Sequence, residues 1–347
     1  MKKSLLLLVI LMLALCLTLA ACGAEEPAPV DPAPEGETPA EEQPAAPAKA
    51  ANLAMATGGT SGTYYAFGGT IATILNNANI GVNINVNSTG ASAENVQLIS
   101  TGDAQLAILQ NDVLSYSYNA TGTWEGKPAI TNTAVLACLY PEQIQVIALA
   151  SSGIASVADL AGKNVSTGDI GSGVETNARQ ILAAYGLSFD DVNQFSLGFG
   201  DSSTAMQDGS LDAVFITSGA PNSAVQELAA SKDIVVVPID GAEAAGLKSD
   251  YPFYADSEIT PEHYSFLEAA VPTLTVQATL ICGSDMADET AYAIVKGIYD
   301  NAADIAASHP KGEYLTPDYA IQGVPIALHP GAVKYYEECG LDVSALK

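Results

Sequence analysis

The sequence predicts an α/β fold made of two similar lobes. From residue 51 onward, short apolar strands alternate with amphipathic helices, which is typical of a sheet covered by helices. Residues 101–108 align with residues 208–215, and in each case a loop rich in Gly, Ser and Thr opens a helix about 40 residues earlier. Two long alternating segments, 143–149 and 274–280, mark the points where the chain changes lobe. The lobes are therefore expected at 51–142 with 280–347, and at 143–279.

The first lobe is expected to contain three short strands, of which the first two are followed by a helix and the third leads into Gln110–Asp112. The strands are predicted at 53–56, 82–86 and 106–109 from their apolar or alternating pattern. The loop 57–63 should open the first helix, with its buried face formed by Tyr65, Ile71, Ile74 and Leu75. Ser92 is a suitable N-cap for the second helix, which ends at Gly102.

The second lobe is expected to follow the same plan. A short helix at 157–161 precedes a strand at 164–166, and the loop 168–173 then opens a helix from Val174 to Ala184. A later helix ends at Gly209, and a strand at 213–216 leads into a loop that includes Ser218. The C-terminal part, 288–307 and 333–338, is predicted to be helical and to return to the first lobe.

The first fifty residues are interpreted as a targeting segment and a tether. Lys2 and Lys3 precede an apolar run that ends in Leu-Ala-Ala before Cys22, and such a cysteine resembles a bacterial lipoprotein cleavage site. Residues 1–21 would then be a lipoprotein signal peptide, and lipidated Cys22 would anchor the chain outside the cell membrane. Residues 22–50, rich in Ala, Pro and Glu, are expected to form a disordered spacer.

Composition excludes several functions. The chain has 39 acidic and 12 basic residues, a formal net charge of −27, so we expect no nucleic-acid partner. There is no CxxC motif, and the three histidines lack the spacing of a zinc site or of a catalytic triad. We therefore expect no metal, no cofactor and no enzymatic activity.

Both Gly/Ser/Thr loops are suited to binding an anion. The first N–H groups of a helix have no partner within the helix, and the helix dipole places partial positive charge there. Thr60, Ser61 and Thr63 add hydroxyl donors in the first loop, and Ser172 and Gly173 repeat this chemistry in the second. The alternative interpretation is ordinary capping and tight turns. Neither loop has the spacing of a Walker A motif.

Four other side chains can each be interpreted in two ways, as a ligand contact or as part of the surface or core. Arg179, the only arginine, could reach a ligand carboxylate or form a surface ion pair. Glu142 could bind a ligand ammonium or be a solvated hinge acid. Tyr64 and Tyr65 open the first helix, so we expect one of them to face the cleft and the other the core.

Several motifs, in order, resemble the TAXI family of TRAP-transporter solute-binding proteins. They are Gly58–Tyr65, Ser88–Asn95, Gly102–Asp112, Leu139–Glu142, Gly171–Arg179 and Gly219–Pro221. The resemblance implies a two-lobed type II periplasmic-binding fold that closes on a small organic acid or amino acid, often glutamate-like. It also implies delivery to a TRAP membrane permease. The expected ligand contacts are Gly59, Thr60, Ser61, Thr63, Tyr64, Ser88, Gln110, Tyr140, Ser172, Gly173, Glu175 and Ser218.

The expected function is thus that of a monomeric, lipid-anchored extracytoplasmic solute receptor. Three alternatives stay open: an amino-acid receptor of an ABC importer, a ligand-sensing receptor for a signalling partner, and an enzyme on the same two-lobed fold. The hypothesis requires that the segments around Ser61 and Ser172 line one crevice.

Overall fold

The computed structural model describes residues 50–347, which belong to one compact unit. The predicted signal peptide, Cys22 and nearly all of the tether lie outside the described residues. The described chain is an α/β protein in which two groups of strands share two long strands, β4 (Thr133–Leu149) and β10 (Val271–Gly283). The fold class predicted from the sequence is therefore confirmed.

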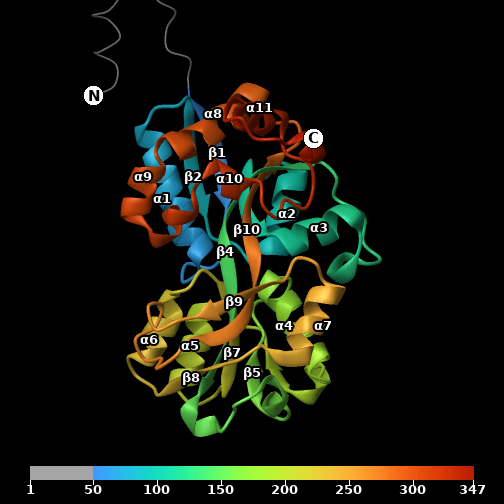
Figure 1. Ribbon diagram of the computed structural model, residues 1–347, viewed down its shortest axis with the longest axis vertical. Coiled ribbons are helices and arrows are strands. Elements are labelled where there is room, and N and C mark those ends of the chain that lie inside the picture. Colours follow the sequence, from blue (N-terminus) through green and yellow to red (C-terminus); the bar gives the residue numbers. More distant parts are fainter. Residues whose placement is uncertain (1–49) are drawn as a thin grey trace, which may run out of the picture. The chain divides into compact units, whose positions relative to one another are not determined.

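Three packed hydrophobic clusters define the two lobes. One cluster takes its side chains from residues 53–140 and 278–343, and we call the elements around it lobe 1. The other two take theirs from residues 144–276, and the elements around them are lobe 2. β4 and β10 pair antiparallel with each other and run through both lobes (Figure 1). The hinge positions stay a prediction.

Lobe 1 begins with three parallel strands, each followed by a helix. Its N-terminal elements are β1 (Ala51–Ala56), α1 (Thr63–Asn77), β2 (Val82–Asn87), α2 (Ser92–Thr101), β3 (Leu106–Gln110) and α3 (Asn111–Asn119). The C-terminal helices that join them are α8 (Asp288–Asp300), α9 (Ala302–Ser308), α10 (Pro317–Ala320) and α11 (Pro330–Glu338). β1 pairs with both β2 and β3, and β10 adds on the other side of β3.

Lobe 2 repeats this arrangement. Its elements are β5 (Asn164–Ser166), α4 (Gly173–Ala184), β6 (Asn193–Phe195), α5 (Phe199–Gln207), β7 (Ala213–Ser218), α6 (Ser223–Ala229), β8 (Ile234–Val237), α7 (Gly241–Asp250) and β9 (Ala255–Ile259). β5 pairs parallel with β6 and β7, and β4 adds antiparallel beside β7 as β10 does beside β3. The sheet order is thus β2-β1-β3-β10 in one lobe and β6-β5-β7-β4 in the other.

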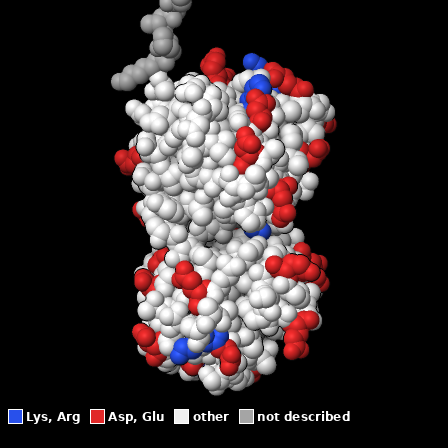
Figure 2. Space-filling view, turned by 90° about the vertical axis from the view of Figure 1, so that its left-hand side faces the viewer, with Lys and Arg blue, Asp and Glu red and all other residues white. Residues whose placement is uncertain are grey.

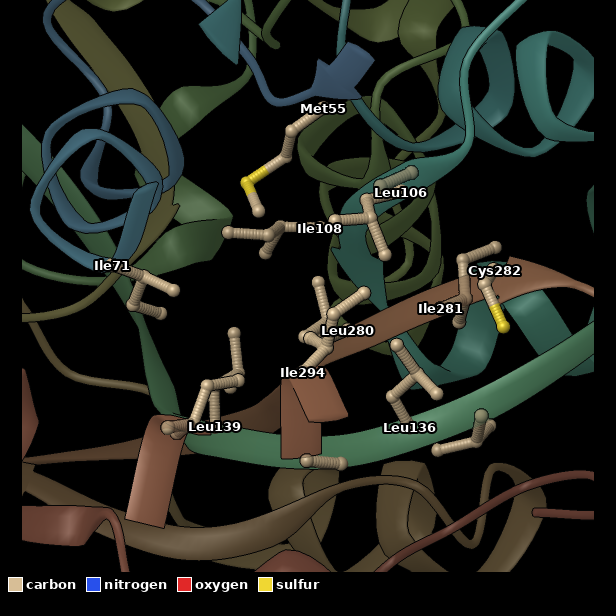
Figure 3. Close-up of a cluster of buried hydrophobic side chains, with 14 of the residues drawn as sticks. Met55, Ile71, Leu106, Ile108, Leu136, Leu139, Leu280, Ile281, Cys282 and Ile294 are labelled. Carbon is tan, nitrogen blue, oxygen red and sulfur yellow. The ribbon is translucent and has the colours of Figure 1, made fainter. Parts of the chain in front are cut away.

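The core of lobe 1 is built from two segments that are far apart in the sequence, residues 53–140 and 278–343. Met55 of β1, Ile71 of α1 and Ile108 of β3 belong to a cluster that also includes Leu280 of β10 and Ile294 of α8, all fully buried (Figure 3). Buried aliphatic side chains of this kind each contribute about 1.5–3 kcal/mol. Lobe 1 is therefore completed only by residues from the C-terminal part of the chain.

Two local predictions differ from the structure. Tyr65 is 36% exposed, and it is Tyr64 that shares the buried face of α1 with Phe67 and Ile71. The reason is that the helix begins at Thr63, which puts residues 64, 67, 68 and 71 on one face. The helix predicted at 288–307 is two helices, α8 and α9, separated at Asn301.

Candidate functional site

A cavity of about 320 Å³ is lined by residues of both lobes. The segments around Ser61 and Ser172 both line it, which is the arrangement that the sequence hypothesis required. The lining residues are Gly58–Tyr64, Ser88, Ala91, Ser92, Gln110, Glu142, Asp169, Ser172, Gly173, Val174, Gly198–Asp201, Thr217 and Ser218.

Four helices begin at this cavity. In lobe 1 the starts of α1 and α2 line it, and in lobe 2 those of α4 and α5 do. Each helix follows a parallel strand (β1, β2, β5 or β6), and the carboxyl ends of parallel strands meet at one edge of a sheet. The repeated topology of the two lobes therefore brings four helix N-termini together.

The loop before α1 leaves its helix start open. The Gly62 N–H donates to the Gly59 carbonyl at 2.8 Å and closes a turn, and the Ser88 hydroxyl donates to the Gly58 carbonyl at 2.9 Å. Among the described residues, no side chain caps α1, and no acidic residue stands in its first turn. The N–H groups at the start of α1 can therefore donate to an anionic group.

The loop before α4 has a different local structure. The Ser172 hydroxyl accepts a hydrogen bond from the Glu175 N–H at 3.1 Å, and the Glu175 carboxylate accepts one from the Gly171 N–H at 2.7 Å. Gly168 has φ +87°, and a Cβ there would overlap Ser172 and Val174. The start of α4 is thus capped by its own side chains.

A buried carboxyl group lies on β4, where this strand pairs with β10 between the two lobes. We call this place the strand crossing. Glu142 of β4 is 1% exposed, and the Tyr64 hydroxyl donates to its Oε2 at 2.6 Å. Burial raises the pKa of Glu142 well above its ordinary value, and the hydrogen bond from Tyr64 and the Lys311 ammonium oppose this rise. Of the two interpretations of Glu142, that of a solvated acid is excluded.

The Gln110 side chain closes another part of the cavity. It is 2% exposed, and its Oε1 has no hydrogen-bond partner among the described residues. The amide lies so close to the start of α4 that a Cβ at Gly173 would overlap it. Lobe 1 thus touches lobe 2 through a polar group whose acceptor is unsatisfied.

Hydrogen bonds join the lobes around the cavity. The Thr63 hydroxyl donates to the Gly219 carbonyl at 3.3 Å, and Asn222 donates to the Ser61 carbonyl at 3.3 Å. On another side, Asn177 of α4 donates to the carboxylate of Asp112 at 3.0 Å. The lobes therefore contact each other in this conformation, and the cavity lies between them.

Most of the expected contact residues line the cavity, and two do not. Those that line it are Gly59, Thr60, Ser61, Thr63, Tyr64, Ser88, Gln110, Ser172, Gly173 and Ser218. Tyr140 lies outside the lining because its fully buried ring packs edge-on against Phe67. Glu175 points its carboxylate back to the Gly171 N–H and to Arg179, which lies 3.1 Å away.

Of the two interpretations of Arg179, the structure supports the surface ion pair. Its side chain is 54% exposed, pairs with Glu175 and stacks at 4.1 Å from the centre of the Phe189 ring. It lines a different cavity, together with Trp124 and Lys127. A helix position seven residues beyond Ser172 is about 10 Å from the cavity, which is too far for this side chain once it is paired.

A group of lining residues in lobe 2 was not predicted from the sequence. Asp169 lies within the predicted loop but was given no role, and Phe199 and Asp201 come from the start of α5, of which only the end was predicted. The signal was present: Gly198 directly precedes α5 and Gly200 lies in its first turn, as glycines lie at the starts of α1 and α4. In lobe 1, Ser92 was predicted to be the N-cap of α2, and this is wrong: the N-cap is Ala91 and Ser92 is the first residue of the helix. The Ser92 hydroxyl does not cap the helix because it accepts a hydrogen bond from the Gln110 N–H at 3.2 Å instead.

No metal site or membrane span is found in the part of the chain that the structure describes. Within residues 50–347, His, Cys, Asp and Glu side chains do not gather in groups of three that could hold a metal ion. In the same range, no helix has the length and apolar character that a membrane crossing needs.

Comparison with known proteins gives a family and several structural likenesses. The model of the family described as NMT1-like matches residues 55–340. A structure from Bordetella bronchiseptica RB50 is similar at 18% identity, covering 83% of this chain and 82% of its own, with a TM-score of 0.49. The periplasmic aliphatic sulphonate binding protein SsuA from Escherichia coli is similar at 14% identity, 83% coverage of both chains and a TM-score of 0.46.

A third similar structure concerns glutathione import in Gram-positive bacteria via GshT and the cystine ABC importer TcyBC of Streptococcus mutans. It shares 12% identity with this chain, covers 78% of this chain and 95% of its own, and has a TM-score of 0.47.

Proposed function

We propose, from the premise that the chain belongs to the NMT1-like family, that it is an extracytoplasmic receptor for a small solute. The observation that carries this proposal is the cavity at which helix starts from both lobes meet. A cavity of about 320 Å³ matches a small metabolite, since ligand pockets usually measure about 300–1,000 Å³. Closure of two lobes around such a site is a familiar way to enclose a ligand.

The site supports binding rather than chemistry. Its polar lining consists of hydroxyl groups, backbone donors, amides and carboxyl groups, and no Cys or His lines it among the described residues. We propose Thr60, Ser61, Tyr64, Ser172 and Ser218 as ligand contacts. The proposed ligand carries a carboxylate, which the open start of α1 would receive.

The partner is proposed to be a membrane importer. The motif resemblance favours a TRAP permease, which is driven by an ion gradient. The second candidate is an ABC importer, the class of transporter to which the Streptococcus mutans structure relates. The segment before Cys22 supports placing the receptor outside the cell membrane on a lipid anchor.

The proposal predicts that a small molecule co-purifies with the protein. The protein is desalted and then denatured, and mass spectrometry of the released small molecules should find one dominant metabolite. In calorimetry this metabolite should rebind to the protein with a stoichiometry of one. Uptake of that metabolite into membrane vesicles from the source cells then separates the partners. Uptake driven by an imposed ion gradient without ATP indicates a TRAP permease, and uptake that needs ATP indicates an ABC importer. A protein that releases no metabolite and binds none would contradict the receptor function.

A further inference from the structure

The charges around the cavity are unevenly distributed. Three acidic side chains line it, Glu142, Asp169 and Asp201, while no Lys, Arg or His does among the described residues. The whole chain is also acidic, with a net charge of −27, and acidic side chains prevail over basic ones on the face in Figure 2. A ligand with two negative charges would therefore enter a site of like charge.

The four helix starts can compensate only part of a ligand's negative charge. At α2 the Glu94 carboxylate already accepts from the Gly90 N–H at 2.6 Å, and at α4 Glu175 accepts from the Gly171 N–H. Asp201 stands in the first turn of α5. Of these four, α1 alone has neither a side-chain cap nor an acid in its first turn among the described residues. The cavity thus offers one uncompensated helix start, which suits one anionic group.

The acidic side chains lie on the lobe 2 side and at the strand crossing. Asp169 and Asp201 both line the cavity, and burial and the negative charge of Asp201 both raise the pKa of Asp169. Glu142 is nearly fully buried and accepts a hydrogen bond from Tyr64. A cationic group of the ligand close to these carboxylates would reduce the repulsion between Asp169 and Asp201. It would also offset the free-energy cost of burying the Glu142 carboxylate.

An unsatisfied acceptor gives independent support. Gln110 lines the cavity, is 2% exposed, and its Oε1 has no hydrogen-bond partner within residues 50–347. A buried acceptor without a donor costs about 1–3 kcal/mol. A ligand N–H group supplies the donor, whereas a carboxylate or keto oxygen cannot.

Other charged and titratable groups near Glu142 do not remove the excess of acidic side chains around the cavity. Lys311, in the 3-10 helix Pro310–Tyr314, is 3% exposed and lines a separate cavity of about 240 Å³ that shares Thr60–Thr63 with the first. Asp112 adds a further negative charge near Glu142, and Tyr64 and Tyr140 are its neutral neighbours. The lysine thus offsets one carboxylate, and the lining keeps an excess of acids.

From these contacts we infer that the cavity selects a ligand with one carboxylate and at least one positively charged nitrogen, so that its net charge is zero or positive. The carboxylate lies at the start of α1, and the cationic nitrogen faces Glu142 and the pair Asp169 and Asp201. The inference rests on the proposed receptor function and narrows its ligand class. Glutamate-like acids and dicarboxylates are excluded by it.

A thermal-shift panel tests the inference with defined probes. The full-length mature chain is heated with each of the common L-amino acids, L-ornithine, L-citrulline, succinate and 2-oxoglutarate. The largest stabilisation is expected from a neutral or cationic amino acid. Two isosteric pairs read out the charge directly: L-glutamine should stabilise more than L-glutamate, and L-arginine more than L-citrulline.

Variants connect the selectivity to the named acids. Glu142→Gln and Asp201→Asn should each weaken binding of the strongest cationic or neutral probe about tenfold or more in calorimetry. Asp208→Asn removes the same charge from a position outside the cavity lining and should leave the affinity unchanged. Strongest stabilisation by succinate, 2-oxoglutarate or L-glutamate would overturn the inference and leave the receptor function standing. If no probe binds and no metabolite co-purifies, the receptor function itself fails.

Discussion

The two lobes repeat one topology and differ in what they bring to the cavity. In both, two parallel strands deliver helix starts to the same edge, so α1 and α2 correspond to α4 and α5. Lobe 1 contributes hydroxyl groups and an uncapped helix, whereas lobe 2 contributes a capped helix and two aspartates. The common fold therefore sets where the groups lie, and the local sequence of each loop sets their charge.

The largest effect is expected at the contact between Gly173 of lobe 2 and Gln110 of lobe 1. In Gly173→Ala the new Cβ would overlap the Gln110 amide of the opposite lobe, so the lobes cannot meet without displacing it. Affinity for the co-purifying solute should fall about 100-fold or more. Small-angle scattering should also show a more open molecule in the presence of that solute.

Gly69→Ala is the matched control for this substitution. Gly69 lies in α1, and a Cβ there meets no atom within 4 Å. This variant should bind the solute like the wild type, because the added Cβ touches nothing. Its helix should not be weakened, because alanine is a better helix former than glycine. Equal affinities for Gly173→Ala and wild type would show that the contact between Gly173 and Gln110 does not control closure.

A second, pH-dependent effect is expected at the contact between α3 and α4. Burial raises the pKa of Asp112 to about 6, while hydrogen bonds from Val113 and Asn177 oppose the rise. An acid whose pKa is higher in the folded than in the unfolded state favours the fold while it is protonated, below about pH 4, and this contribution is lost as the pH rises through about 6. The loss amounts to roughly 3 kcal/mol at neutral pH.

Asp112→Asn isolates this contribution, because it removes the ionisation and keeps the size of the side chain. The variant should unfold at higher urea concentration than the wild type at pH 7, and the difference should shrink toward zero near pH 4. Urea melts at four pH values measure it. A difference that is the same at every pH would contradict the assigned titration.

The smallest effects should distinguish the two helix starts. Ser172→Ala removes the cap of α4 and should lower the free energy of unfolding by about 1 kcal/mol, as well as weaken solute binding. Thr60→Ala removes a hydroxyl before an uncapped helix, so it should weaken binding about fivefold with no change in unfolding. Calorimetry and urea melts on both variants measure this. Unchanged affinity in both would remove the assignment of these loops to the site.

Much of the fold could be predicted because the strongest signals are local. β1, β3, β7 and the crossing strands β4 and β10 are apolar or alternating runs whose pattern is readable without neighbours. The elements that were not predicted include α3, β6, α6, β8, α7 and β9. β6 and β8 have only three and four residues, and α7 does not gather its apolar residues on one face. Asn301 divides α8 from α9 within a segment that otherwise keeps helical periodicity.

The site could be predicted where backbone chemistry defines it. Glycines and hydroxyls before a helix identify the loops at 57–63 and 168–173 from the sequence alone. Glu142 could not be assigned in this way, because its burial comes from β10 and β7 on either side of β4 and from α1, which supplies Tyr64. Asp169 and Asp201 line the same cavity only because the segments that carry them, about 30 residues apart, follow strands that end at the same edge of the sheet.

The core of lobe 1 has a consequence for the order of folding. Residues from both ends of the chain fill it, so β10 and α8 must be synthesised before Met55 and Ile108 can be fully packed. Lobe 2, though it comes later in the sequence, is encoded without interruption between its crossing strands. On the ribosome, residues 51–140 of lobe 1 are therefore made before lobe 2 but can complete their core only after lobe 2 has been made.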